Sequence, residues 1–414
     1  MKINLRPWFI WGLGAAFFFI EYFARIAPSI MAPDLMRTFN VTAFGLGSLS
    51  AYFYTSYLGM QIPVGMLIDK YGLHKLLTIS AFICFLSCIG FAVATNLHVA
   101  ELCRFTLGFG AAFAFVSALK LALIGLPQRW FGLLAGITQA LGMLGASVGD
   151  GPMSIIVVHY GWRFTMGSIG FIFLILSILI FIFVRDKKNI QKNFSYLAPK
   201  LWHSFIKVVE NKHCWFNAAF AGLIYAPTAA FAELWGVSFL SQGYQLTQEK
   251  AAFAVGLIFI GWGVGGPLAG WISDRIGKRK PIMKVSGLCG VILLSLLIYY
   301  PNLSTGIICL LLFLYGFTNT GLVASYAVAG EICTKQVAGT SLAFANIASV
   351  LIGAVFQPLI GRILDLHWQQ TLVNGVRIYS LADYRMALFA LPACSLLSLL
   401  VLTFVKETYC NPIE

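Results

Sequence analysis

Five charged side chains lie inside long apolar stretches of the sequence, where a charge is costly unless it has a partner or a function. Glu21 and Arg25 are one helical turn apart in FFFIEYFARIAPS, so they can pair on one face of a helix. Arg104, Asp150 and Glu233 each stand in a separate apolar stretch. A carboxylate can carry a proton, and a guanidinium can bind a carboxylate or a phosphate. These residue types indicate a buried path for protons and for a polar solute.

Structural roles are the alternative interpretation of the same residues. Glu21 and Arg25 would then form a fixed ion pair near the outer interface. Arg104 would be a partner of Asp150, and Asp150 would hydrogen-bond a neighbouring helix. For Glu233, the mid-membrane acid of the second half, we predict a functional role, either in contacting substrate or in carrying a proton.

Neutral polar side chains extend this candidate path. Tyr54, Tyr57 and Gln61 form an amphipathic stripe that suits the wall of a cavity. Other hydrogen-bonding candidates within apolar stretches are Gln139, Asn319, Asn346 and Gln357. Hydrogen bonding between helices, which is common in membranes, is the alternative for all of them.

Composition places these residues in a membrane protein. Of the 414 residues, 59% are hydrophobic and 10% are charged, and the mean hydropathy is +0.84. Apolar stretches of about 20 residues, enough to cross a bilayer core, recur along the chain. The nine cysteines are scattered singly, so the sequence predicts no metal site, no disulfide framework and no cofactor.

The net charge of +13 does not indicate nucleic-acid binding. The positive residues gather in short segments between the apolar stretches, as the positive-inside rule requires of a membrane protein. Their distribution predicts that both termini lie in the cytoplasm. The expected location is a bacterial-type inner membrane. The cytoplasmic positive residues are Lys70, Lys75, Arg129, Arg275, Lys278, Arg279, Lys280 and Lys335, together with those of the central linker.

We predict an all-α membrane protein of twelve transmembrane helices in two bundles of six. The first six helices are expected over 8–30, 43–68, 75–95, 99–124, 131–157 and 162–184. The second six are expected over 214–240, 248–273, 282–300, 304–329, 338–363 and 384–405. The N-terminal bundle is then 1–185, the cytoplasmic linker 186–212 and the C-terminal bundle 213–414.

The two halves repeat one pattern. GMLIDKYGLHK at 65–75 returns as GWISDRIGKRK at 270–280, which separates Asp69 from Asp274 by 205 residues. Trp8 and Phe9 open the first predicted helix, and Trp215 precedes Phe216 at the start of the seventh. The fifth and eleventh helices also align. Two similar six-helix halves indicate an internal repeat about an axis along the membrane normal.

The repeated loop resembles the signature of the major facilitator superfamily, G-x-L-x-D-[RK]-x-G-x-[RK]. The first copy matches with Gly65, Leu67, Asp69, Lys70, Gly72 and Lys75, while His74 replaces a second basic residue. The second copy matches with Gly270, Asp274, Arg275, Gly277 and Arg279, while Ile272 replaces the leucine. Arg104 followed by Gly108 and Gly110 resembles a further motif of that family.

The resemblance implies a secondary transporter with alternating access and the major facilitator fold. The loop residues would form a cytoplasmic gate, in which Asp69 and Asp274 pair with a basic residue or with a helix N-terminus. Solvated helix ends are the alternative for one copy alone. No nucleophile motif, phosphate-binding loop or nucleotide-binding domain is evident in the sequence, so we expect neither an enzyme nor a use of ATP.

The most favoured function is proton-coupled uptake of a small polar nutrient such as an amino acid, a nucleoside or an organic anion. The stretches YFARIAPSIMAPDLMRTF and YTSYLGMQIPVGMLIDKYG resemble phagosomal nutrient transporters of intracellular bacteria. A drug or metabolite exporter, a siderophore importer and a non-transporting sensor are the alternatives. The exporter is disfavoured because Asp150 replaces the proline of the family's antiporter motif. The expected partners are substrate, protons and lipids, with the chain as a monomer and no nucleic acid.

Overall fold

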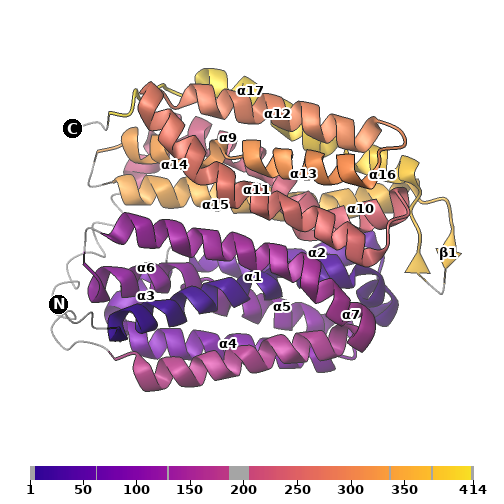
Figure 1. Cartoon of the computed structure of the whole chain (residues 1–414), viewed down its shortest axis with the longest axis horizontal. Coiled ribbons are helices and arrows are strands. Elements are labelled where there is room, and N and C mark those ends of the chain that lie inside the picture. Colours follow the sequence, from indigo (N-terminus) through magenta and orange to yellow (C-terminus); the bar gives the residue numbers. More distant parts are fainter. Residues whose placement is uncertain are drawn as a thin grey trace. The chain divides into compact units, whose positions relative to one another are not determined.

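The computed structural model describes residues 5–61, 63–127, 130–185, 205–334, 337–373 and 376–411. Almost all of the described chain is helical (Figure 1). Arg129, Lys335 and most of the predicted linker lie outside these residues, as does the side chain of Asp69.

Seven helices form in the described residues before the linker. They are α1 (Arg6–Phe39), α2 (Ala43–Met60), α3 (Pro63–Tyr71), α4 (Leu73–Val93), α5 (Leu97–Ala111), α6 (Phe113–Gly125) and α7 (Phe131–Phe183). Helices α2 and α3 together cover the second predicted span, and α5 with α6 covers the fourth. The fifth and sixth predicted spans are joined in α7, which turns at Gly161 with a φ of +81°, a conformation that glycine adopts without strain.

The segment after the linker holds interrupted helices and one short hairpin. Its elements are α9 (Lys212–Pro227), the π-helical segment η2 (Thr228–Trp235), α10 (Gly236–Gly243), α11 (Gln248–Ile276), α12 (Lys280–Tyr299), α13 (Thr305–Thr318), α14 (Gly321–Glu331), α15 (Ala338–His367), α16 (Leu381–Leu388) and α17 (Ala390–Phe404). Between α15 and α16, β1 (Leu372–Val373) pairs antiparallel with β2 (Val376–Arg377).

Ten helical stretches of the described residues are long and apolar enough to cross a membrane. One of them, Leu133–Phe183, holds two predicted spans, and the α2–α3 stretch is not among the ten. The prediction of an all-α, multi-pass membrane protein is confirmed. The number twelve follows when α7 is divided at Gly161 and α2 with α3 is counted as one span.

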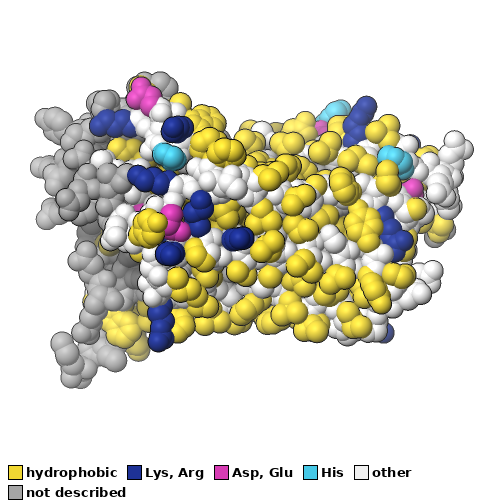
Figure 2. Space-filling model, turned by 90° about the horizontal axis from the view of Figure 1, so that it is seen from above, with side chains coloured by type: hydrophobic (Ala, Val, Ile, Leu, Met, Phe, Trp, Pro, Cys, Tyr) yellow, Lys and Arg dark blue, Asp and Glu magenta, His cyan; other side chains and the backbone are white. Residues whose placement is uncertain are grey.

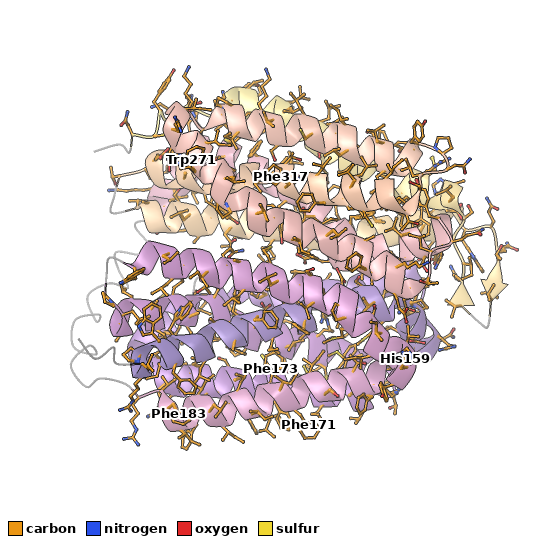
Figure 3. The ribbon with its side chains drawn as sticks, in the orientation of Figure 1. His159, Phe171, Phe173, Phe183, Trp271 and Phe317 are labelled. Atoms are coloured by element: carbon orange, nitrogen blue, oxygen red, sulfur yellow. The ribbon has the colours of Figure 1, made fainter. Side chains whose placement is uncertain are left out.

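The exposed side chains are those of a surface that faces lipid. On the face shown in Figure 2, hydrophobic side chains occupy the middle, and Lys and Arg gather toward the two ends. Figure 3 labels Phe171 and Phe173, two residues apart on α7, which are 58% and 0% exposed. Trp271 on α11 is 57% exposed. A helix apolar on its outer face as well as its inner face requires an apolar solvent.

The described residues cluster by contact into two compact units. The first contains the described residues up to Ala27 and those from Tyr52 to Arg185. The second contains Pro28–Ala51 and all described residues from Phe205 onward. The boundary therefore divides α1 just before Pro28, and it divides α2 after Ala51. The end of α1 and the beginning of α2, residues Pro28–Ala51, therefore make most of their contacts with the helices of the second half.

Two glycines at equivalent places of the repeat let helices cross closely. Gly108 on α5 lies against α2, where a Cβ would collide with the carbonyl oxygen of Phe53. Gly316 on α13 lies against α11, where a Cβ would collide with the carbonyl oxygen of Ile258. The two glycines are 208 residues apart, and the two carbonyl groups are 205 apart, the spacing of the repeated loop. Each unit thus contains the same crossing of its second and fourth spans.

Filling either crossing should destabilise the protein. We expect Gly108→Ala and Gly316→Ala each to lower the free energy of unfolding by about 1–3 kcal/mol, because backbone must move to admit the methyl group. The measurement is thermal unfolding of the purified protein in detergent. Gly59→Ala and Gly306→Ala are the matched controls, since nothing lies within 4 Å of a Cβ built at either helical position. Equal stability of test and control variants would contradict the crossing.

Candidate functional site

The ion pair of Glu21 and Arg25 is buried in the first unit. The Nε of Arg25 donates to Glu21 Oε1 at 3.0 Å, and its Nη2 lies 2.8 Å from the same oxygen. Glu21 is 1% exposed and Arg25 is 4% exposed. The guanidinium carbon lies 4.4 Å from the ring centroid of Tyr22 and 4.8 Å from that of Tyr57. One carboxylate and two aromatic faces therefore stabilise this cation away from water.

Arg104 lies on α5 and binds the backbone of α1. Its Nη1 donates to the carbonyl oxygen of Ala24 at 2.7 Å, and its Nη2 donates to that of Arg25 at 3.0 Å. In a regular helix the Ala24 oxygen would accept from the N–H of residue 28, but Pro28 has none. Arg104 therefore supplies the hydrogen bond that the proline removes.

This geometry gives Arg104 a structural task besides the substrate role predicted from sequence. Two of its three nitrogens are bound to backbone, and its Nε has no hydrogen-bond partner among the described residues. The side chain is 1% exposed. The predicted role in binding a carboxylate therefore stays a prediction, and it would require Nε or a rearrangement of α1.

Asp150 lies on α7 where that helix packs against α1. A Cβ at Gly145 would collide with the Phe19 carbonyl oxygen, and one at Gly149 would lie 2.8 Å from Ile26 Cδ1. Asp150 follows Gly149 directly and is fully buried. Glu21, Arg25 and Arg104 thus meet on one segment of α1, and Asp150 follows a glycine that packs against the same helix. Their role in a path for substrate or protons stays a prediction.

Glu233 occupies a π-helical segment in the second unit. It is fully buried in η2, and the hydroxyl of Tyr225 donates to its Oε1 at 2.8 Å. The ring of Tyr225 meets the Trp262 ring edge to face, with centroids 6.1 Å apart. Short π-helical insertions occur often at functional sites, because they shift side chains and free backbone groups.

Two amides hold the irregular backbone around η2. Asn319 Nδ2 donates to the Ile224 carbonyl oxygen at 3.2 Å, and Gln357 Nε2 donates to the Ala229 oxygen at 2.9 Å. Both side chains are fully buried. Asn319 Oδ1 and Gln357 Oε1 have no partner among the described residues, so both can accept a hydrogen bond from a bound molecule.

The other predicted path residues are placed less centrally. Tyr54 and Tyr57 are buried, while Gln61 follows the end of α2 and is half-buried. Gln139 is exposed on α7. Asn346 accepts from the Tyr326 hydroxyl at 2.9 Å, which is the interhelical bond that was the alternative for it.

The second copy of the gate loop forms an ion network. Gly277 ends α11 with a left-handed φ of +69°. Arg279 Nη1 donates to Asp274 Oδ1 at 2.5 Å, and its Nη2 donates to Glu331 Oε1 at 2.6 Å. Burial alone would lower the pKa of Arg279, but the hydrogen bonds to Glu331 and Asp274 outweigh it and raise that pKa. Arg279 thus stays charged throughout the physiological range.

The remaining predicted gate residues lie near aromatic rings or at helix boundaries. Arg275 stacks on Trp271, with its guanidinium carbon 5.2 Å from the ring centroid. Gly72 precedes α4 with a φ of +91°, and the Lys70 ammonium lies 5.1 Å from the Tyr71 ring. Gly65 and Gly270 face open space.

Sequence reasoning missed the contribution of the C-terminal segment to this network. Glu407 accepts from the backbone N–H of Arg279 at 2.8 Å and of Lys280 at 2.9 Å, so it caps the start of α12. The Thr408 hydroxyl donates to Glu331 Oε2 at 2.5 Å. The position of Glu407, an acid directly after the last apolar span, was the one signal in the sequence. No sequence motif indicates which residues it contacts.

Asp365 is a second residue that the sequence did not single out. Within the second unit it accepts from the backbone N–H groups of Ala43 at 3.3 Å and Phe44 at 2.9 Å, at the start of α2. The Tyr379 hydroxyl donates to its Oδ1 at 2.7 Å, and Arg377 Nη1 does so at 3.3 Å. Burial, followed by the hydrogen bond and charge of Asp365, raises the pKa of Tyr379. We call these residues the Asp365 cluster.

Glycines bring α2 and α15 close enough for the Asp365 cluster to form. A Cβ at Gly361 would collide with the Ala43 carbonyl oxygen, and one at Gly47 would lie 2.6 Å from the Gln357 carbonyl oxygen. The acid therefore sits at the positive end of the α2 dipole, with two further donors around it. An acid at a helix N-terminus is the chemistry that was predicted for Asp69 and Asp274, but here it lies at the start of α2.

Comparison with known proteins identifies the family. The sequence model of the Major Facilitator Superfamily matches residues 14–358, so the chain belongs to that superfamily of membrane transporters and is not an enzyme. It is 23% identical to the probable galactarate/D-glucarate transporter GarP of Escherichia coli (strain K12), over 83% of this chain and 86% of that one. It is 24% identical to the membrane sensor protein UhpC of the same strain, over 92% and 90%.

A solved structure shares the fold. The crystal structure of a D-xylose-proton symporter superposes with a TM-score of 0.73 over 98% of this chain and 99% of that chain, at 16% identity. The predicted major facilitator fold is confirmed, and the class of protein is a secondary transporter.

A double-mutant cycle tests the bond between Arg104 and the backbone at Pro28. We expect Arg104→Leu to lower the free energy of unfolding by about 1–3 kcal/mol, because two buried carbonyl groups lose a donor. Pro28→Ala restores an N–H for the Ala24 oxygen. In that background Arg104→Leu should cost about 1 kcal/mol less. Thermal unfolding of the four proteins measures the coupling, and strict additivity would contradict the assignment.

A second prediction concerns the Asp365 cluster. Asp365→Asn removes the charge at the start of α2, so the amides of Ala43 and Phe44 should exchange hydrogen about fivefold faster, the factor for ~1 kcal/mol. Hydrogen–deuterium exchange of the peptide that covers the start of α2 is the measurement. Asp34→Asn is the control, because Asp34 pairs with exposed Arg37 on α1. Unchanged exchange in Asp365→Asn would show that the carboxylate does not hold α2.

Proposed function

We propose that this transporter takes up a small organic anion together with a proton. The single observation that carries the proposal is the buried pair of Glu21 and Arg25, in which one titratable acid neutralises one fixed cation inside a membrane-spanning helix. An isolated charge is costly there, so Arg25 always needs an anionic partner. Either Glu21 or the carboxylate of a substrate can serve.

This competition couples the two solutes. When Glu21 takes up a proton, its attraction for Arg25 falls, and a substrate carboxylate can replace it at the guanidinium. When the substrate leaves, Glu21 must release its proton to neutralise Arg25 again. One proton then accompanies each substrate molecule, so the uptake of a monoanion is electroneutral and the uptake of a dianion such as D-glucarate carries one negative charge inward. Tyr22 and Tyr57 keep the guanidinium in place during the exchange.

Movement of the helices gives the substrate access to Arg25, which is 4% exposed here. Alternating access supplies that movement, and the boundary of the two units inside α1 at Pro28 places a natural bending point three residues after Arg25. Arg104 holds the backbone on the N-terminal side of this point. We therefore assign Arg104 as a positioning residue for Arg25.

The second unit has buried polar groups of its own. Asn319 and Gln357 each present a buried oxygen without a partner, and Glu233 with Tyr225 presents a hydrogen-bonded acid. Such acceptors suit the hydroxyl or ammonium groups of a substrate. The name of the relative GarP, a probable transporter of galactarate and D-glucarate, supports a hydroxylated carboxylate as the class. The solved D-xylose-proton symporter supports the proton as the coupling ion.

The direction of transport follows from the proposed orientation. With both termini in the cytoplasm, the Arg279 network faces the cytoplasm and the Asp365 cluster faces the outside. A proton gradient directed into the cell then drives accumulation of the substrate inside. The chain acts as a monomer in a lipid bilayer in this proposal. The alternatives of an exporter, a siderophore importer and a sensor give different outcomes in the experiment below.

The test uses proteoliposomes with an imposed inward proton gradient. We expect accumulation of radiolabelled D-glucarate, with amino acids, nucleosides and a siderophore as comparison solutes. Glu21→Gln, an uncharged mimic of protonated glutamate, should retain exchange of D-glucarate but lose accumulation driven by the gradient. Arg25→Leu should lose both. Glu101→Gln is the control, since Glu101 pairs with exposed His98 at a helix start.

Each other outcome points elsewhere. Gradient-driven accumulation by Glu21→Gln equal to that of the wild type would rule out Glu21 as the proton carrier. Outward pumping would establish an exporter, and uptake of the siderophore alone would establish that class of importer. Absence of flux for every solute would favour a sensor, to which the similarity with UhpC also draws attention.

A further inference from the structure

Two cysteines far apart in sequence meet where three helices of the second unit end. Cys214 lies in the first turn of α9, and Cys333 follows the end of α14. Their sulfur atoms are 3.4 Å apart, and Ser341 Oγ in the first turn of α15 lies 3.7 Å from Cys214 Sγ. The Nδ2 of Asn211 lies 4.0 Å from Cys333 Sγ. Both thiols are buried, with exposures of 2% and 7%.

This pair differs from the other cysteines of the chain. All nine cysteines are described and none forms a disulfide. Among the described contacts, only Cys214 and Cys333 hydrogen-bond sulfur to sulfur. A disulfide has a sulfur–sulfur distance of about 2.0 Å, so a small rotation of the side chains would bring the two atoms to bonding distance. Burial disfavours a thiolate here, and the nearby Ser341 hydroxyl and Asn211 amide can donate to the sulfur atoms against that effect.

The position of the pair gives such a bond a consequence for transport. Helix α9 continues into η2, which carries Glu233, and α14 follows the break that holds Asn319. Both candidate residues thus lie on helices that are interrupted near mid-span and end at the thiol pair. A covalent link between these ends would remove their freedom to move relative to each other.

We propose that Cys214 and Cys333 are an oxidation site, at which a peroxide forms a reversible disulfide that slows transport. One thiolate attacks hydrogen peroxide, which forms a sulfenic acid and releases hydroxide; with the thiol proton this gives one water. The second thiol then attacks the sulfenic sulfur, forms the disulfide and releases a second water. The two thiols lose two electrons and two protons in total, and the peroxide is reduced to water. A dithiol reductant reverses the reaction.

The bond itself can be tested without a substrate. The full-length protein in detergent is treated with hydrogen peroxide, digested and analysed by mass spectrometry. We expect a linked peptide pair that contains Cys214 and Cys333, 2 Da lighter than the sum of the two, and lost on reduction. Oxidation should also raise the unfolding temperature by about 5 °C or more, because the bond closes a long loop. Absence of the linked pair would overturn the proposal.

Variants separate this pair from the other thiols. Cys214→Ser and Cys333→Ser, singly and together, should abolish both the linked peptide and the change in unfolding temperature. Cys84→Ser and Cys410→Ser are the matched controls and should respond as the wild type does. An equal response of the double variant to peroxide would also overturn the proposal.

The effect on transport rests on the proposed function and has its own readout. Peroxide should lower the initial rate of D-glucarate uptake severalfold in wild-type proteoliposomes, a reductant should restore it, and the double variant should be insensitive. A linked peptide with an unchanged uptake rate would refute the regulatory part. If the reduced protein carries no D-glucarate, the proposed function fails, while the peptide and unfolding measurements still decide whether the disulfide forms.

Discussion

Every polar backbone group within a bilayer must find a partner inside the protein, and this constraint explains the placement of the polar side chains. Pro28 removes a donor from α1, and Arg104 replaces it. The helix of the second half is irregular near Pro227 for a different reason: the N–H of Thr228 bonds to Tyr225, and Asn319 binds the Ile224 carbonyl oxygen that this N–H would reach in a regular helix. In both halves a side chain of the fourth span repairs the backbone of the first. The irregular helices that a transporter needs for motion therefore depend on these few bonds.

The same constraint explains why structural and functional interpretations of a residue are not exclusive here. Arg104 repairs a carbonyl group of α1 and thereby fixes the segment that carries Arg25. Gln357 binds the backbone of η2 through its nitrogen and leaves its oxygen for a ligand. A polar group that stabilises an interrupted helix is already buried, oriented and close to flexible backbone. Those are the properties that substrate binding also requires.

Local patterns allowed the fold and part of the site to be predicted. The apolar periods predicted the helices, and the one-turn spacing of Glu21 and Arg25 predicted that they could pair, as they do. Contacts over long sequence distances could not be predicted. Asp365 binds amides more than 300 residues away, and Arg104 binds carbonyl groups about 80 residues away. Neither spacing has a period or a motif, because both contacts arise only when whole helices have packed.

The two acidic clusters of the second unit, around Asp274 and around Asp365, differ in strength. Asp274 is 67% exposed and its partner Arg279 is shared with Glu331, so solvent weakens that pair. Asp365 is 17% exposed and accepts from two amides, a hydroxyl and a guanidinium. Four charge-assisted hydrogen bonds to one partly buried carboxylate are together stronger than one ion pair that is exposed to solvent. Removing Asp365 from its place would therefore leave four donors without an acceptor, so the start of α2 is held to the second unit more firmly than Asp274 is held to Arg279.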